Sequence, residues 1–210
     1  MQNDSIYVSG KTPDGACYWV NGKKTDLSSY FILGYSEISS IKYVNNTLYL
    51  ADRSPESGYW IDNKRYVLGY NCMAFDIEIN HGDVYVAGSR EYYEHKDKAC
   101  YWVNGQINEF GDGFIADMYV NSNIYCTGHR YPSPQHEDTT GFYLINSDLY
   151  PLEGKITWGT GIDIENTNVY VSGYCISNAN SRYIACYWID DKKFDLENNY
   201  FSSAESILVE

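Results

Sequence analysis

Two short phrases recur five times in the 210 residues, and this repetition limits the folds that the chain can adopt. The clearest copy of the first phrase is Val84-Tyr85-Val86-Ala87-Gly88, and that of the second is Ala99-Cys100-Tyr101-Trp102-Val103-Asn104-Gly105. The second phrase carries its main aromatic residue at Trp19, Trp60, Trp102, Tyr143 and Trp188, so successive copies lie 41, 42, 41 and 45 residues apart. A period of about 40 residues, built from strand-like phrases, is typical of a β-propeller.

Each repeat can be divided into four strands. A stretch in which apolar and polar residues alternate, such as Ile77-Glu78-Ile79, precedes the first phrase. Alternating stretches of this kind, bounded by Gly, Asn and Asp residues, predict β-strands. The second phrase ends in a two-residue corner that tolerates the positive φ of a tight hairpin, and a short fourth strand follows. The corners are Asn21-Gly22, Asp62-Asn63, Asn104-Gly105, Asn146-Ser147 and Asp190-Asp191. No window has the helical period with caps, so we expect almost no helix.

The two ends of the sequence correspond to different parts of a repeat. Ile6–Val8 corresponds to a second strand, whereas Ala204–Val209 corresponds to a first strand. We therefore expect Ser206–Val209 to pair beside Ile6–Val8 and to close a ring, which would remove two open sheet edges. The prediction is an all-β chain in which residues 1–210 form a single five-bladed β-propeller with four-stranded antiparallel blades.

The repeated aromatic residues have an explanation that needs no ligand. Large aromatic side chains bury roughly 150–250 Å² each, and they recur in every repeat, whereas a single ligand site needs only one or two of them. We expect them to pack between neighbouring blades, which also accounts for the 23 tyrosines. The tyrosines of the first phrase are Tyr7, Tyr49, Tyr85, Tyr125 and Tyr170.

The charge of the chain argues against two classes of partner. The formal net charge is −13, from 28 acidic and 15 basic side chains, and no stripe of Lys and Arg occurs. Nucleic-acid binding and attraction to an anionic membrane surface both need such a stripe. No apolar run approaches the length of about 18 residues that a membrane span requires. We expect no nucleic-acid partner, no membrane insertion and a monomer.

The six cysteines do not form an obvious disulfide or metal framework. Three of them take the same position in repeats one, three and five, too far apart for the short Cβ separation of a disulfide. These three are Cys17, Cys100 and Cys186. Cys126 takes an apolar strand position, whereas Cys72 and Cys175 are predicted to lie in connections, where they could pair or react. Zinc-ligand spacing is absent, so we expect no metal site and no cofactor.

The connection between the second and third strands differs most between repeats. It is short in repeats one and two and about twice as long in repeats three to five. Variable loops on a repeated scaffold usually carry binding, and Tyr, Arg and His are frequent in recognition hot spots. The candidate ligand-binding residues here are Arg90, Tyr92, Tyr93, His129, Arg130, Tyr131 and Tyr174. The alternative is a set of solvated loops with locally packed tyrosines.

A further candidate is Trp158, which lies in a link between blades. On a five-bladed ring the links stand around one mouth of the central channel, where an aromatic ring could stack on a sugar. The residues near this position in other repeats are smaller or shifted, so repeat packing explains Trp158 least well. A buried plug at the start of each inner strand explains the same spacing without a ligand.

Acidic residues beside the inner strands raise two sharper hypotheses. A glycosidase needs two carboxylates about 5 to 10 Å apart, and a calcium site needs six to eight oxygen ligands. The residues concerned are Asp76, Glu78, Asp117, Asp163 and Glu205. Repeats this short leave no inserted loop that could build a deep cleft. The sequence also lacks a nucleophile elbow and a glycine-rich phosphate loop. We therefore predict no enzyme and no catalytic residues.

With the Val84–Gly88 and Ala99–Gly105 phrases, the chain resembles a family of bacterial repeat proteins of the form VYVAG…YW-NG. Members are common among the secreted proteins and lipoproteins of Bacteroides-like bacteria. The resemblance covers essentially the whole chain, and it implies a propeller and an exported location. Repeat four departs most, because Phe142-Tyr143-Leu144 replaces Tyr-Trp-Val. In size and blade number the chain is also similar to the tachylectin-type five-bladed lectins, which bind amino sugars once per blade.

These features together predict a non-enzymatic recognition module that binds a ligand, with carbohydrate ahead of protein, on its variable-loop face. An extracytoplasmic location (periplasmic, cell-surface or secreted) is expected, although the opening Met1-Gln2-Asn3-Asp4 carries no signal peptide. The alternatives are a protein–protein docking platform of a surface assembly and a small glycosidase.

Overall fold

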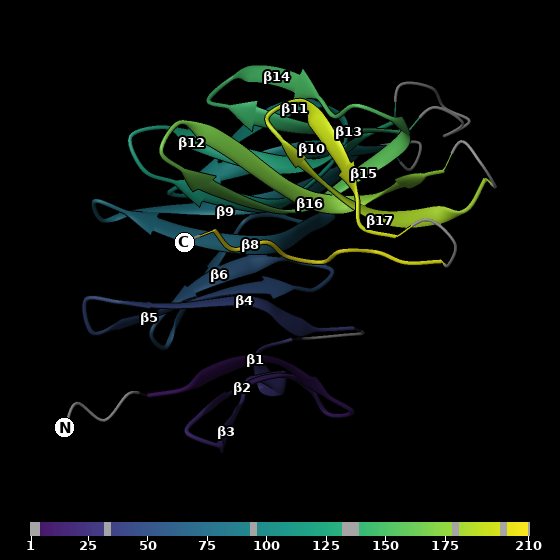
Figure 1. Ribbon diagram of the computed structural model, residues 1–210. Helices are drawn as coiled ribbons and strands as arrows, with labels where there is room; N and C mark the ends of the chain where they lie inside the picture. The colour runs from purple at the N-terminus through teal and green to yellow at the C-terminus, as the bar shows by residue number, and fades with distance from the viewer. Residues whose placement is uncertain are drawn as a thin grey trace.

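A computed structural model describes residues 5–31, 35–92, 96–131, 139–177, 181–197 and 201–209 of the chain (Figure 1). Its elements are β-strands apart from one 3-10 turn, η1 (Ser28–Tyr30), which confirms the all-β prediction. The first repeat forms an antiparallel sheet of β1 (Tyr7–Thr12), β2 (Gly15–Val20) and β3 (Lys23–Asp26). In the part of the chain that the structure describes, no helix has the length and apolarity needed to cross a membrane.

The second and fifth repeats each form a four-stranded antiparallel sheet, in which neighbouring strands follow one another in the chain. The second repeat contains β4 (Glu37–Val44), β5 (Thr47–Arg53), β6 (Gly58–Ile61) and β7 (Lys64–Val67). The fifth contains β15 (Lys155–Glu165), β16 (Asn168–Ile176), β17 (Tyr183–Ile189) and β18 (Lys192–Asp195). Both repeats have the four strands predicted for them.

The third and fourth repeats share one seven-stranded sheet, because β11 (Gln106–Val120) belongs to both. The other strands are β8 (Cys72–Asn80), β9 (Asp83–Tyr92), β10 (Lys96–Val103), β12 (Ile124–Arg130), β13 (Thr140–Ile145) and β14 (Asp148–Pro151). The beginning of β11 pairs with β10, and its end pairs with β12. The prediction of two separate strands, the fourth of repeat three and the first of repeat four, is therefore wrong, because one strand serves as both. Gly111 and Gly113, with φ of 98° and 139°, redirect the strand without ending it.

The two-residue corners each bind the start of the second strand in their own repeat. The side-chain oxygen of Asn104 accepts a hydrogen bond from the N–H of Val84 at 3.0 Å, and the N–H of Asn104 donates to the Val84 carbonyl at 2.8 Å. The same pair of hydrogen bonds recurs in every repeat, at Asn21, Asp62, Asn104, Asn146 and Asp190. All five residues have φ between 50° and 57°, which Asn and Asp tolerate. The divergent fourth repeat thus keeps the backbone pattern of the others.

The glycine that ends the first phrase is explained by a bulge in the neighbouring strand. The first strand of each of repeats two to five shifts its register by one residue beside this position. A Cβ atom on Gly88 would overlap the carbonyl oxygen of Met73, and Gly128 and Gly173 meet first-strand carbonyls in the same way. In repeats three to five this close approach of backbone to backbone therefore requires glycine, whereas the second repeat has Asp52 at the same position.

We expect Gly88→Ala to lower the free energy of unfolding by about 2–4 kcal/mol, because the added methyl group meets paired backbone rather than a flexible side chain. Urea denaturation followed by tryptophan fluorescence measures this cost. Gly105→Ala is the matched control, since a Cβ there meets nothing within 4 Å and only the left-handed φ of 83° opposes it. That control should lose about 1 kcal/mol. Equal losses in the two variants would contradict the steric explanation.

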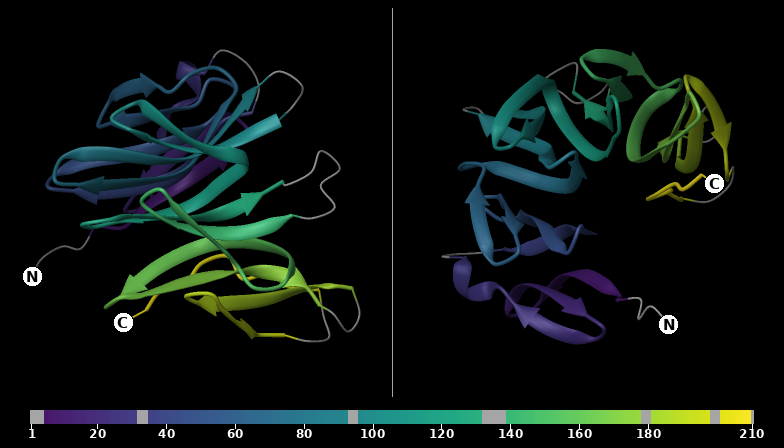
Figure 2. Two further views of the ribbon diagram at one scale, coloured as in Figure 1. Left: turned by 90° about the horizontal axis from the view of Figure 1, so that it is seen from above. Right: turned by 90° about the vertical axis from the view of Figure 1, so that its left-hand side faces the viewer.

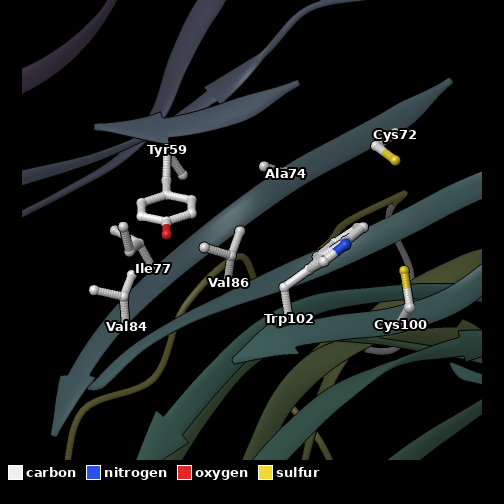
Figure 3. Packing of buried hydrophobic residues seen from close by; sticks show 9 residues of the cluster. Tyr59, Cys72, Ala74, Ile77, Val84, Val86, Cys100 and Trp102 are labelled. Carbon is white, nitrogen blue, oxygen red and sulfur yellow. The ribbon is translucent and has the colours of Figure 1, made fainter. Parts of the chain in front are cut away.

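Apolar clusters lie between consecutive repeats, where the sheets face one another. One cluster joins Tyr59 of the second repeat to Trp102 of the third, and Figure 3 shows both rings between the strands. Tyr59 and its neighbour Trp60 point to opposite faces of β6, so Trp60 packs in the cluster shared with the first repeat. Trp60, Trp102 and Trp188 are fully buried. The repeated aromatic residues of these clusters therefore pack between repeats, as predicted.

The sheets follow one another around an open arc, with β1–β3 at one end and the C-terminal segment at the other (Figure 2). The predicted closing pair is not formed, since β1 is paired with β2 and its sheet has three strands. Ile6 and Leu208, which would lie near the junction, are 67% and 78% exposed. The structure thus differs from the predicted closed ring at the junction of its two ends.

Residues 201–209 nevertheless lie along the fifth repeat as a further first strand would. The hydroxyl of Ser39 on β4 donates to the carbonyl of Ala74 at 2.9 Å, which joins the second repeat to β8. Thr160 on β15 donates to the carbonyl of Ala204 at 2.5 Å in the same manner. Gly161 leaves room for the approach, because a Cβ there would lie 2.8 Å from the segment. Ala204 therefore takes the position that Ala74 takes in β8.

Candidate functional site

Five of the binding residues predicted to lie in variable loops lie in strands instead. β9, β12 and β16 continue beyond the first phrase, so Arg90, Tyr92, His129, Arg130 and Tyr174 are paired with neighbouring strands. The prediction of long, free connections is wrong in this respect, because the hairpin pairing extends further than the repeated phrases. Side chains on paired strands are held more rigidly than side chains on loops.

Trp158 and Tyr174 face each other across two paired strands. Trp158 of β15 lies opposite Tyr174 of β16, with ring centroids 4.8 Å apart and planes inclined by 20°. Such stacked cross-strand pairs stabilise a sheet and fix both rings. In the other repeats the register places Glu37, Met73 and Phe114 at the position of Trp158. The tryptophan is therefore particular to the fifth repeat, which agrees with the sequence argument.

These two rings line a pocket of about 440 Å³. Tyr183 stands steeply to both, with ring centroids 5.2 Å from Trp158 and 5.8 Å from Tyr174. Phe201, which is 73% exposed, lies 5.5 Å from Tyr183. The rest of the lining is polar and comes from Thr160, Ser202, Ser203 and Glu205. The pocket thus combines flat apolar rings with hydroxyl groups and a carboxylate.

Ring contacts extend this aromatic surface toward the fourth repeat. His129 lies 6.1 Å from Trp158 and 3.9 Å from Phe114, centroid to centroid. Its Nε2 is 2.7 Å from the hydroxyl of Tyr131. His129 is only 3% exposed, so it supports the neighbouring rings from within. The structure therefore brings Trp158, Tyr174, His129 and Tyr131 together as one group.

The pocket has an acidic character. Glu205 is its carboxylate, and the hydroxyl of Ser203 donates to Oε1 of Glu205 at 2.5 Å. Burial, followed by the negative charge of Glu205, raises the pKa of Tyr174. The Tyr174 hydroxyl therefore remains protonated at neutral pH and can donate a hydrogen bond. Among the described lining residues there is no lysine, arginine or histidine.

The other predicted residues do not line this pocket. Arg90 lies opposite Cys72 in β8, and the guanidinium of Arg130 lies beside Gly111. Tyr92 is the last residue of β9, and Tyr93 lies outside the described residues. The lining residues that the sequence prediction missed are Thr160, Tyr183, Phe201, Ser202, Ser203 and Glu205. The aromatic character of Tyr183 and Phe201 was the signal for two of them, but their approach to Trp158 depends on the path of residues 201–209.

Two further pockets lie at the second repeat. The larger has a volume of about 570 Å³ and is lined in part by Tyr35, Arg53 and Glu91. The smaller, of about 290 Å³, shares Ser54 and Pro55 with it. Tyr35 lines the larger pocket, Tyr30 and Tyr70 line the smaller one, and all three tyrosines are exposed. The surface is tyrosine-rich but contains no stacked pair comparable to Trp158 and Tyr174 among its described lining residues.

Asp76 and Asp117, on the adjacent first strands β8 and β11, form a hydrogen-bonded carboxyl pair. The Ser40 hydroxyl donates to Asp76 at 2.7 Å, and the N–H of Ile162 donates to Asp117 at 2.8 Å, so the pair connects consecutive repeats. Burial, followed by the charge of Asp76, raises the pKa of Asp117 to about 8. Carboxyl groups in direct contact leave no space for a sugar between them, whereas hydrolysis needs a gap of about 5 to 10 Å.

All six cysteines are buried free thiols. Cys72 and Cys175, predicted to lie in connections, instead lie in β8 and β16. Cys72 and Cys100 lie at the same end of their cluster, beyond Trp102 (Figure 3). A side-chain hydrogen bond with Cys186 outweighs burial and lowers the pKa of Cys175 to about 7. Four of the six cysteines therefore form two neighbouring pairs, Cys72 with Cys100 and Cys175 with Cys186, that the linear sequence does not reveal.

A scan of known protein families and a search of curated proteins found no match to this chain.

Proposed function

We propose that the chain is a five-bladed β-propeller that binds a carbohydrate in the pocket of Trp158, Tyr174, Tyr183 and Phe201. The observation that carries this proposal is the stacked pair of Trp158 and Tyr174 beside a carboxylate and several hydroxyl groups. Aromatic rings offer flat apolar area to the C–H face of a sugar, while polar groups at the rim bind its hydroxyls.

The propeller part of the proposal has two supports. The corner hydrogen bonds repeat five times, and the first strands of successive repeats are in contact from β4 to β15. The hydrogen bond from Thr160 to Ala204 matches that from Ser39 to Ala74, which supports the role of residues 204–209 as a first strand in this proposal. In a closed ring this strand would complete the three-stranded sheet of the first repeat. Closure would also cover the open edge of β1.

The module is non-enzymatic and extracytoplasmic in this proposal. Asp76 and Asp117 contact each other and bind groups of neighbouring repeats, so this pair serves the scaffold rather than a hydrolytic site. The resemblance to exported bacterial repeat proteins supports the location. The pocket of Trp158 and Tyr174, of about 440 Å³, is lined by aromatic rings and hydroxyl groups, a composition that favours recognition over turnover.

We expect Trp158→Ala to weaken glycan binding by about 30-fold, or about 2 kcal/mol, because it removes the central ring of the pocket. A glycan array identifies the ligand, and titration calorimetry with that glycan measures the change. Tyr70→Ala is the matched control, since Tyr70 is exposed in the smaller pocket of the second repeat. The control should bind as the unaltered protein does. A thermal melt of both variants confirms that each is folded.

If the unaltered protein binds no glycan on the array, the carbohydrate proposal is overturned. Unchanged binding by a folded Trp158→Ala variant would instead place the site elsewhere.

The second candidate function is protein docking at the second repeat. Two adjoining pockets, ringed by exposed tyrosines, give that surface the composition of a recognition hot spot. Loss of partner capture by Tyr70→Ala, with Trp158→Ala unaffected, would favour docking over carbohydrate binding.

A further inference from the structure

Two thiols and a carboxylate converge on one face of the fifth sheet. Cys175 lies on β16, Cys186 on β17 and Asp195 on β18. Cys186 is directly opposite Asp195, and it is also opposite Gly173, two residues before Cys175. Residues related in this way share a face of a sheet. One ligand atom from each of the three residues lies within 4.8 Å of those of the other two.

The burial of the three groups suits a bound cation. Both cysteines have no exposed surface, whereas Asp195 is exposed at the sheet edge. The thiols would thus form the closed side of a site, and the carboxylate would form its open side. Tyr174 lies next to Cys175 in β16 and points to the other face of the sheet, so this cluster is separate from the aromatic pocket.

The strand positions favour a metal bridge over a disulfide. Cys175 and Cys186 are diagonal rather than opposite neighbours, and diagonal Cα atoms lie about 7–8 Å apart. A disulfide accepts Cα separations of about 4.4–6.8 Å. A metal ion with Zn–S bonds of about 2.3 Å joins two sulfurs without drawing them into covalent contact.

Lys193 occupies the approach to this cluster. Its Nζ lies 2.9 Å from the carboxylate of Asp195 and 3.6 Å from Sγ of Cys175. The ammonium group of Lys193 thus supplies a positive charge beside the carboxylate of Asp195 and the acidic thiol groups. Because its side chain is 20% exposed, it can turn toward solvent when another cation takes its place.

The first repeat contains the same arrangement with one difference. Cys17 lies opposite Asp26 as Cys186 lies opposite Asp195, and Lys24 is 3.3 Å from Asp26. Thr12 takes the place of Cys175, and its hydroxyl accepts a hydrogen bond from Lys24 at 3.1 Å. The presence of a lysine and an aspartate beside one cysteine is therefore a feature that the first and fifth repeats share. This shared feature does not explain the second thiol.

We propose that Cys175, Cys186 and Asp195 bind a thiophilic divalent cation of the Zn²⁺ class, with water as the fourth ligand. The two thiolates select for zinc and cadmium over the harder magnesium and calcium ions. On binding, each thiol that still carries a proton releases it to solvent, and Lys193 moves away from the ligands. No electron transfer takes part, and the metal keeps its oxidation state.

Cadmium titration of the reduced full-length chain tests this site, since cadmium thiolates absorb in the ultraviolet. We expect one tight equivalent of cadmium with a thiolate charge-transfer band, and zinc should abolish the band by competition. Cys175→Thr introduces the residue that the first repeat already accommodates at this position, and it should remove the tight equivalent. Thr12→Cys should create a second one beside Cys17 and Asp26.

Controls separate this site from the other thiols. Cys100→Ser, which alters the cluster of Cys72 and Cys100, should leave the tight equivalent intact, and Lys193→Gln should strengthen binding by removing the competing charge. A band that persists in Cys175→Thr, or that disappears only in Cys100→Ser, would overturn the assignment. Absence of any tight equivalent in the folded, reduced protein would do so as well. The gain in Thr12→Cys does not depend on how well the loss variant folds.

Discussion

Arg65→Ala should lower the free energy of unfolding by about 3–5 kcal/mol, the cost of leaving a buried carboxylate without its partner. Arg65 donates two hydrogen bonds to Asp52, from Nε to Oδ2 at 2.9 Å and from Nη2 to Oδ1 at 3.0 Å. The Asp52 side chain has no exposed surface, and it also accepts the indole N–H of Trp60 at 2.9 Å. Truncation of Arg65 removes the positive charge but leaves the negative charge inside the second repeat. Urea denaturation at neutral pH measures the loss.

The third repeat supplies the matched control for this variant. Strand register places Gly88 and Ile107 at the positions of Asp52 and Arg65. The double variant Asp52→Gly with Arg65→Ile therefore removes both charges and introduces a pair that another repeat already accommodates. We expect it to recover most of the lost stability. If the double variant is as unstable as Arg65→Ala, lost packing rather than the unpaired charge explains the effect.

Asp117→Asn removes a pH dependence of stability that the unaltered protein carries. The folded pKa of Asp117 is raised from 3.8 to about 8, so the folded state retains a proton that the unfolded chain releases. Its contribution to stability is fully present below about pH 4 and is lost as the pH rises toward 8. Asparagine cannot ionise, yet it can accept from Ile162 and donate to Asp76 as the protonated acid does.

The variant should therefore gain on the unaltered protein between pH 4 and pH 8, by about 2–4 kcal/mol at the upper end. Four pKa units at about 1.4 kcal/mol each set the ceiling of this gain. Denaturation curves at several pH values measure the difference. Asp148→Asn, at an exposed carboxyl of β14, should follow the unaltered protein throughout. If the free energy of unfolding of Asp117→Asn and of the unaltered protein changes with pH in the same way, the raised pKa of Asp117 is contradicted.

The sequence predicted most of the local structure, because the local structure depends on short-range rules. The residue type of Asn104 predicts a tight turn, because asparagine tolerates a positive φ. Gly88 lies where the backbone of one strand closely approaches that of its neighbour. The union of two repeats through β11 could not be predicted, because it depends on how two glycines redirect a strand. The lengths of β9, β12 and β16 also escaped prediction, since hairpin pairing, rather than the repeated phrase, decides where they end.

The candidate pocket was predictable only in part. Trp158 departs from the repeat, so comparison of the repeats identified it, and Tyr174 followed from its place after the first phrase. Phe201 and Glu205 reach the pocket because residues 201–209 contact the fifth repeat, whereas the repeat predicted only that Ser206–Val209 pair beside Ile6–Val8. The pairing of Cys175 with Cys186 was missed for a similar reason. It arises from a diagonal position across two strands, and the spacing in sequence does not show it.

The continuous strand β11 has a consequence for how the array can be divided. Repeat proteins change length by whole units, and each unit must separate cleanly from the next. Such breaks exist after β3, β7 and β14, where one sheet ends before the next begins. Between the third and fourth repeats a cut would divide β11 itself, because its first half pairs with β10 and its second half continues without a break to pair with β12. We therefore expect repeats one, two and five to be deleted or duplicated singly more readily than repeats three and four, whose common boundary lies inside one strand.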